Sequence, residues 1–112
     1  PLLLSSAASD VYKRQRYERE VAAKLREHGY EAIRGCQFAG GQDSPDVRCD
    51  DFPCHIEAKF VERLNILDAY KQSERDAGDK PPCVIHRKKN LPYSLITLRL
   101  EHFIELTNKT NT

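Results

Sequence analysis

Apolar and polar residues alternate along residues 46–60, and this stretch organises the reading of the whole chain. Val47 and Cys49 alternate with charged residues, and a second alternating run follows: Cys54, Ile56, Ala58 and Phe60 with His55, Glu57 and Lys59. A period of two is typical of strands that bury one face. The segment 50–53 between the two runs has turn chemistry, and Pro53 is excluded from central strand positions. The pattern therefore predicts a β-hairpin with a four-residue loop.

The predicted register of this hairpin points to a metal site. A loop of four residues places Cys49 opposite Cys54, Arg48 opposite His55, Val47 opposite Ile56, and Asp46 opposite Glu57. Directly opposed side chains lie roughly 4.5–5.5 Å apart, where like charges destabilise a sheet. Asp46 and Glu57 therefore need a cation between them, and Lys59 lies two residues beyond Glu57 on the same face. Hard oxygen ligands favour Mg²⁺, with Mn²⁺ as a substitute, over zinc.

Helical spacing predicts a first helix over residues 16–28, which Gly29 terminates. Val21, Ala22 and Leu25 form one apolar stripe, and Glu18 falls near its middle. One interpretation places Glu18 in an exposed first turn, where its charge complements the helix dipole. Because a metal site would need a further ligand, we instead expect Glu18 to face inward as the third metal ligand.

The rest of the chain predicts an α/β fold. The expected elements are a strand at 30–35, a glycine-containing loop at 38–43, a helix at 65–77, a strand at 83–86, a basic turn at 87–90, a strand at 94–100 and a helix at 101–106. Together with the hairpin, these give the order α–β–β–β–α–β–β–α. We expect a central mixed β-sheet flanked by helices, in one domain over residues 16–107, with a frayed tail at 108–112.

Composition limits the possible partners. The chain has 112 residues and a formal charge of +1, so any nucleic-acid surface must be a local patch. No apolar run approaches the roughly 18 residues of a membrane span, and we expect no membrane partner. The four cysteines contain no C-x₂-C pair, so buried, reduced thiols are favoured over a zinc site.

Residues 1–15 follow a different pattern from the rest. The stretch 5–15 resembles an in-frame translation of a transposon-derived sequencing adapter, and the chain lacks an initiator Met. We interpret residues 1–15 as a non-native, disordered segment and expect a gene truncated at its start.

A family resemblance adds to this reading. Pro45-Asp46 followed by Glu57-Ala58-Lys59 resembles the PD-(D/E)XK nuclease signature. The flanking matches are Tyr17–Val21, Glu27–Tyr30, Ala32–Arg34, the Gly40-Gly41 loop, Glu62–Ile66, Gln72-Ser73, Asp76-Ala77 and His86–Lys88. Over residues 17–106 the chain is similar to the archaeal-type and phage Holliday junction resolvases. The resemblance implies a restriction-endonuclease-like domain with Glu18 as a metal ligand. The family's basic segment ahead of the first helix is absent, which predicts weakened DNA affinity.

The predicted function is that of a Mg²⁺-dependent endodeoxyribonuclease, a phage-type Holliday junction resolvase acting as a homodimer in the cytoplasm of a bacterial cell or a phage-infected host. The predicted catalytic residues are Glu18, Asp46, Glu57 and Lys59, the first three as metal ligands. The predicted DNA contacts are Arg34, Gly40, Gly41, Arg87 and Lys88, and the auxiliary residues are His55 and Gln72. Two alternatives stay open: a repair or restriction nuclease of the same fold, and a non-catalytic DNA-binding module. The glycine loop, the basic turn and His55 also have a non-functional interpretation, as solvated surface positions.

Overall fold

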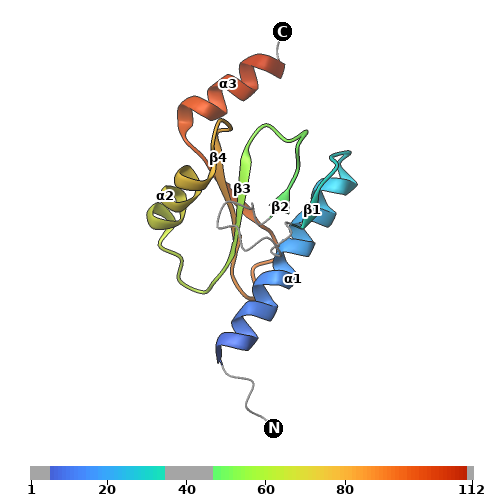
Figure 1. Cartoon of the computed structure of the whole chain (residues 1–112), viewed down its shortest axis with the longest axis vertical. Coiled ribbons are helices and arrows are strands. Elements are labelled where there is room, and N and C mark those ends of the chain that lie inside the picture. Colours follow the sequence, from blue (N-terminus) through green and yellow to red (C-terminus); the bar gives the residue numbers. More distant parts are fainter. Residues whose placement is uncertain (1–5, 35–46, 111–112) are drawn as a thin grey trace.

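The computed structural model describes residues 6–34 and 47–110 and has the predicted element order. Its elements are α1 (Ser6–Glu27), β1 (Ile33–Arg34), β2 (Val47–Arg48), β3 (His55–Phe60), α2 (Ile66–Asp76), β4 (Pro82–Arg87), β5 (Leu95–Thr97) and α3 (Leu100–Thr110). The order α–β–β–β–α–β–β–α confirms the α/β prediction (Figure 1).

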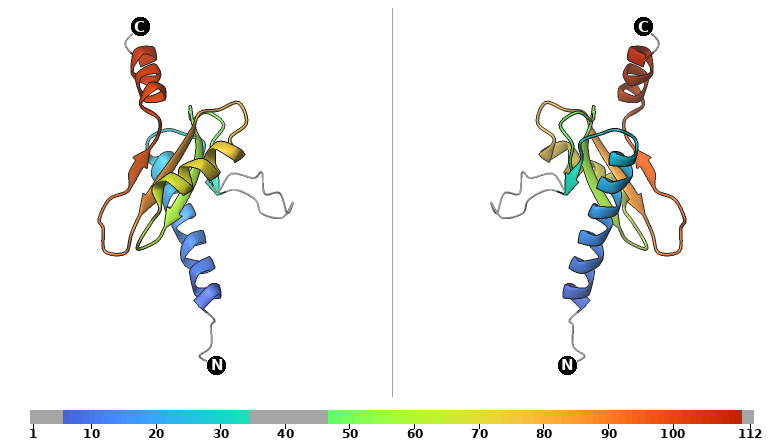
Figure 2. Two further views of the ribbon diagram at one scale, coloured as in Figure 1. Left: turned by 90° about the vertical axis from the view of Figure 1, so that its left-hand side faces the viewer. Right: turned by 90° about the vertical axis from the view of Figure 1, so that its right-hand side faces the viewer.

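The five strands form one mixed sheet in the order β1-β2-β3-β4-β5. Strands β3 and β4 are parallel, and the other neighbours are antiparallel. A parallel pair needs a crossover connection, and α2 provides it. Helices α1 and α2 lie on opposite faces of the sheet (Figure 2). Strand β3 is therefore central in both directions, with a strand on each side and a helix on each face.

Strict alternation along β3 divides its side chains between these two faces. Ile56 and Ala58 join the main core under α1, whose other buried members are Tyr17, Val21, Ala22, Ala32, Val47, Cys49, Cys54 and Cys83. Glu57 and Lys59 therefore point to the face that α2 covers. The pairing of Val47 with Ile56 confirms the predicted hairpin register within the described strands.

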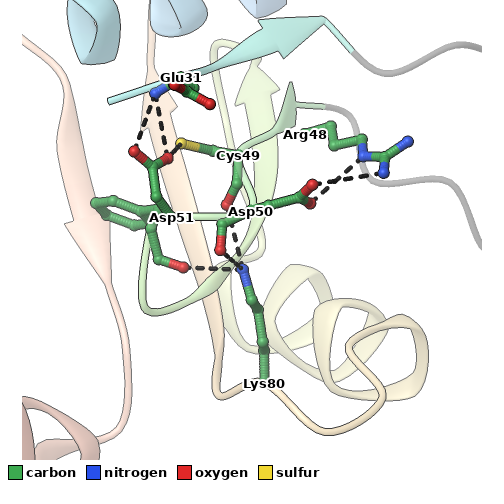
Figure 3. A network of polar contacts seen from close by, with 7 residues as sticks. Glu31, Arg48, Cys49, Asp50, Asp51 and Lys80 are labelled. Atoms are coloured by element: carbon green, nitrogen blue, oxygen red, sulfur yellow. Dashed lines mark hydrogen bonds and ion pairs between the residues drawn. The ribbon is translucent and has the colours of Figure 1, made fainter. Parts of the chain in front are cut away.

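A lysine from a distant part of the chain holds the hairpin loop in place (Figure 3). The Lys80 Nζ donates hydrogen bonds to the carbonyl oxygens of Cys49, Asp50 and Phe52, at 3.2, 3.2 and 2.9 Å. On the other side of the loop, the Asp51 carboxylate accepts hydrogen bonds from the Glu31 backbone N–H and the Cys49 thiol. The loop that fixes the β2–β3 register is thus bonded to two other segments.

The ends of two helices differ from the sequence-based expectation. Helix α1 begins at Ser6 rather than at residue 16, so residues 6–15 are helical and not disordered. Once the inner turns of α1 are docked, each added residue needs no new nucleation, and Ala, Lys, Arg and Gln favour continuation. The non-native origin of residues 1–15 stays a prediction. Helix α3 likewise continues to Thr110, beyond the expected end at 106, with Lys109 favourably placed in its last turn.

The remaining boundaries differ by a few residues. Strand β1 covers 33–34 rather than 30–35, β5 covers 95–97 rather than 94–100, and β4 covers 82–87 rather than 83–86. The predicted caps of the middle helix are present. The Asn65 side chain accepts a hydrogen bond from the Asp68 N–H at 3.1 Å, and Gly78 follows the helix with φ +61°.

We expect Lys80→Met to destabilise the protein by about 1–3 kcal/mol, because it keeps the aliphatic stem but removes the donor to three carbonyl groups. Thermal unfolding followed by circular dichroism measures the change. The matched control is Lys71→Met at an exposed position of α2, which should leave the melting temperature nearly unchanged. Equal effects of the two substitutions would show that the loop does not depend on Lys80.

Candidate active site

Glu57, Lys59 and Gln72 meet on the α2 face of the sheet. The Lys59 Nζ lies 3.5 Å from the Glu57 Oε1 and donates a hydrogen bond to the Gln72 Oε1 at 3.4 Å. Gln72 reaches the lysine from α2, and the next residue anchors that helix, because the Ser73 hydroxyl donates to the Cys83 carbonyl at 3.3 Å. The ammonium group is thus held between two oxygen atoms from different elements. Gln72, predicted as an auxiliary residue, lies at the site.

Two glutamates are buried in the described part of the chain. Glu57 is 4% exposed and Glu18 is 1% exposed. Burial of Glu18 confirms that it lies on the inward side of α1, and the exposed first-turn interpretation is wrong. The Arg14 guanidinium lies beside Glu18, with its Nε 4.0 Å from the Glu18 Oε2. Carboxylates are rarely buried unless they are paired or bind a metal. Each side chain by itself therefore fits the requirements of a hard metal ligand. Glu57 points to the face of the sheet that α2 covers, whereas Glu18 belongs to α1 on the opposite face, so a metal shared by the two stays a prediction.

The third predicted ligand, Asp46, lies outside the described residues, as do Gly40 and Gly41. Its pairing with Glu57 stays a prediction. Within residues 6–34 and 47–110 no three His, Cys, Asp or Glu side chains come together as a metal site. The three-carboxylate arrangement, which includes Asp46, stays a prediction.

Arg87, a predicted DNA contact, takes part in an extensive network within the protein. Its guanidinium donates to both carboxylate oxygens of Glu20, at 2.8 and 3.1 Å, and to the Leu91 carbonyl at 3.1 Å. The same group lies 5.5 Å from the ring centre of Tyr17 and 5.0 Å from that of Phe60. Stacking and a two-pronged ion pair favour Arg over Lys at such a position. Arg87 therefore joins α1 to the end of the β3–β4 pair, and any DNA contact would compete with these bonds.

A groove of about 810 Å³ opens beside Lys59 and Arg87. Its charged lining residues are Lys13, Arg14, Arg16, Lys59, Arg87 and Lys89, with Glu20 and Glu62. We call it the basic groove, because its lining contains six cationic side chains and two carboxylates. Such a surface suits a phosphate backbone. Arg16 and Lys89 were not among the predicted contacts. The basic run at residues 87–89 would have allowed Lys89 to be predicted from the sequence. Lys13 and Arg14 belong to the adapter-like stretch and were therefore not considered as contacts.

Lys88 and Arg34 are the other two predicted DNA contacts within the described residues. Lys88 is exposed at the end of β4, and Arg34 is in β1, paired through its backbone with Val47. His55 is buried, 9% exposed, so the solvated-edge interpretation of this residue is wrong.

His86 lies beside Lys59 in the parallel register of β3 and β4, so the two side chains share a face. Its Nε2 is 3.0 Å from the Thr97 hydroxyl oxygen. Burial lowers the pKa of His86 below its usual value, which keeps the imidazole neutral near pH 7. The lysine is therefore not opposed by a second cation on that side.

Three cysteines are buried, as predicted, and each is a free thiol: Cys49, Cys54 and Cys83. Burial, together with the hydrogen bond to Asp51, raises the pKa of Cys49 to about 11. The hydrogen bond with Cys54 raises the pKa of Cys83 as well. Both groups are thus protonated at neutral pH and behave as core side chains. Cys36 lies outside the described residues.

Comparison with known families now identifies the fold. The family model for the archaeal Holliday junction resolvase (Hjc) matches residues 10–66, which include Glu18, Glu57 and Lys59. The chain belongs to this family. The sheet with helices on both faces is accordingly a restriction-endonuclease-like fold, and membership implies a nuclease of the junction-resolving type.

Neither the curated proteins nor the solved structures contain a match to the chain. Among the helices in residues 6–34 and 47–110, none has the length and apolar character needed to cross a membrane.

Gln72→Leu should lower the rate of DNA cleavage by about tenfold, since the loss of one hydrogen bond to a charged group frees Lys59 to leave its position. The measurement is single-turnover cleavage of a four-way junction at saturating enzyme. Lys71→Leu, one residue away on the exposed side of α2, should cleave at the wild-type rate. Junction binding without a divalent ion should be unchanged in both, and a Gln72→Leu enzyme of full activity would contradict the positioning role.

Proposed function

We propose that this chain is a metal-dependent endonuclease that resolves four-way DNA junctions, with Glu18, Asp46 and Glu57 as metal ligands and Lys59 as the catalytic cation. The observation that carries the proposal is the buried Glu57 beside Lys59 on the central strand, within a chain of the junction-resolvase family. The intact set of Asp46, Glu57 and Lys59 argues against a non-catalytic module of the same fold.

Mg²⁺ is the proposed cofactor, because hard carboxylate oxygens are the donors available at the site. When bound, it would supply a water of lowered pKa and stabilise negative charge on the scissile phosphate. Glu57 and Glu18 offer carboxylates that burial shields from bulk water, which strengthens their attraction for a cation. Mn²⁺ should substitute for Mg²⁺.

Lys59 has a separate role in the proposed reaction. Its ammonium is fixed by Glu57 and Gln72, so it needs little reorganisation to face a charged reactant. A preorganised cation favours the transition state, where charge on the phosphate oxygens grows, over the ground state. Lys59 would therefore orient the attacking water or stabilise the pentacovalent phosphorus centre. In-line hydrolysis would then leave 5′-phosphate and 3′-hydroxyl ends, as the family resemblance implies.

The basic groove would hold the phosphate backbone next to this site. Contacts to phosphates position DNA without reading its sequence, which suits an enzyme that recognises a branched shape. We further propose that the enzyme is of the phage type, on the basis of the resemblance at Gln72-Ser73 and His86–Lys88, and that it acts as a homodimer, since resolution needs two symmetric cuts.

The deciding experiment compares a four-way junction with a linear duplex that has the same arm sequences. In Mg²⁺ we expect paired nicks at symmetric positions on two opposing strands of the junction, and much slower cutting of the duplex. A chelator should abolish cleavage, and Mn²⁺ should restore it. Equal cutting of both substrates would favour a general repair or restriction nuclease, and no cutting of either would favour a DNA-binding module.

Glu18 and Glu20 provide a matched pair of substitutions on one helix. Glu18→Gln should lower cleavage by at least about 100-fold, since loss of a ligand costs more than the roughly 10–100-fold seen for groups that only support ligands. Glu20→Gln should lose little, because the amide still accepts a bond from Arg87. Cleavage rates at several Mg²⁺ concentrations distinguish a weakened metal site from a lost one. Equal losses would mean that Glu18 acts only through the fold.

A further inference from the structure

Several contacts fix the Arg87 side chain at the wall of the basic groove. Arg87 is the partner of Phe60 in the β3–β4 register, and its guanidinium lies 5.0 Å from the Phe60 ring centre and 5.5 Å from that of Tyr17. Its Nη1 donates a hydrogen bond to the Leu91 carbonyl at 3.1 Å. None of these contacts involves Glu20. The guanidinium would therefore keep its place if the Glu20 side chain moved away.

The Glu20 carboxylate occupies the remaining edge of this guanidinium. The Arg87 Nη2 and Nε donate to the two oxygens of the same carboxylate, at 2.8 and 3.1 Å. This is the two-pronged geometry in which an arginine binds a phosphate. Both side chains line the basic groove. Glu20 therefore stands where a phosphate of a bound DNA strand would form the same two bonds.

Displacement of Glu20 from Arg87 costs little free energy. The Glu20 side chain is 48% exposed, whereas that of Arg87 is 21% exposed. An ion pair with a solvated partner is weak, because water compensates the carboxylate when the pair breaks. A phosphate on a DNA strand has the additional advantage that its binding releases condensed counterions. The two anions can therefore exchange on the same arginine.

We propose that Arg87 is a phosphate-binding site of the basic groove and that the Glu20 carboxylate is its built-in competitor. A strand that enters the groove replaces Glu20 at the Nε–Nη2 edge, and Glu20 returns to that edge when the strand leaves. The competitor lowers the affinity of the groove for DNA and speeds the release of a cut product. This inference rests on the proposed function, because it describes how the same groove is regulated.

The test is the affinity of Glu20→Gln for a fluorescently labelled four-way junction and for a matched linear duplex, measured by anisotropy without divalent ions. The substitution reduces the two-pronged ion pair to a neutral hydrogen bond. Both DNA molecules should bind about fivefold more tightly than to the wild type, which is the factor that a partly exposed ion pair accounts for. Dissociation of a nicked duplex, the product of cleavage, should slow by a similar factor.

Two controls separate competition for Arg87 from a change in net charge. Glu62→Gln makes the same change of charge at the other carboxylate of the groove lining, and screening should limit its effect on affinity to less than about twofold. Glu20→Asp keeps the charge but is one methylene shorter. It loses the two-pronged contact and should still bind DNA about threefold more tightly than the wild type. Wild-type affinity in Glu20→Asp, or equal gains in Glu20→Gln and Glu62→Gln, would overturn the proposal.

Arg87→Met tests the other partner of the ion pair. Without the guanidinium, adding Glu20→Gln should raise the affinity for DNA no more than Glu62→Gln does, and a full fivefold gain would contradict the exchange on Arg87. Thermal unfolding shows whether Arg87→Met folds, and the comparison with Glu20→Asp decides the question if it does not.

Cleavage of the junction by the wild type in Mg²⁺ is measured in parallel. A wild type that does not cut, beside a Glu20→Gln protein that binds DNA more tightly, would count against the proposed function alone. A wild type that cuts, beside Glu20 variants that bind no more tightly, would count against this inference alone. Failure of every variant to bind DNA would overturn both.

Discussion

The alternation of side chains along β3 is the constraint on which the rest of the molecule depends. A strand with neighbours on both sides and helices on both faces must send successive side chains into two different environments. Ile56 and Ala58 complete the core under α1, and Glu57 and Lys59 are forced onto the face of α2. A shift of one residue would exchange the two sets and bury the charged pair in the main core. The fold and the site are therefore specified by the same register.

That register explains why several distant contacts converge on this part of the sheet. Lys80 and Asp51 secure the loop between β2 and β3, and Arg87 secures the far end of β3 to α1. Between these two fixed ends, Lys59 is held by Glu57 and Gln72. A catalytic cation works best when the surrounding groups hold it before the substrate arrives. The charged networks near β3 thus hold this strand and Lys59 in place, as the proposed role of Lys59 requires.

The small size of the domain leaves some of its apolar residues outside the core. The N-terminal helix and the hairpin supply most of the main core, with Tyr17, Val47 and Ile56 among its fully buried side chains. The C-terminal end contributes Leu98 and Leu106 to that core and leaves an apolar stripe of α3, formed by Leu100, Phe103 and Ile104, in solvent. A chain of 112 residues buries a smaller share of its surface than a larger protein does.

The sequence by itself determined the order of the elements, the Val47–Ile56 register and the inward position of Glu18, because periods of 2 and 3.6 residues report which side of an element is buried. Only the tertiary structure decided that Arg87 binds Glu20, that Gln72 holds Lys59 and that Lys80 closes the hairpin loop. Each of these bonds joins elements that local patterns describe separately, and their meeting depends on how helices dock on the sheet. The same holds for α3, whose apolar stripe reads as a core face in the sequence. In the structure Leu106 is partly buried against the main core, whereas the stripe is exposed, and the sequence pattern does not distinguish the two.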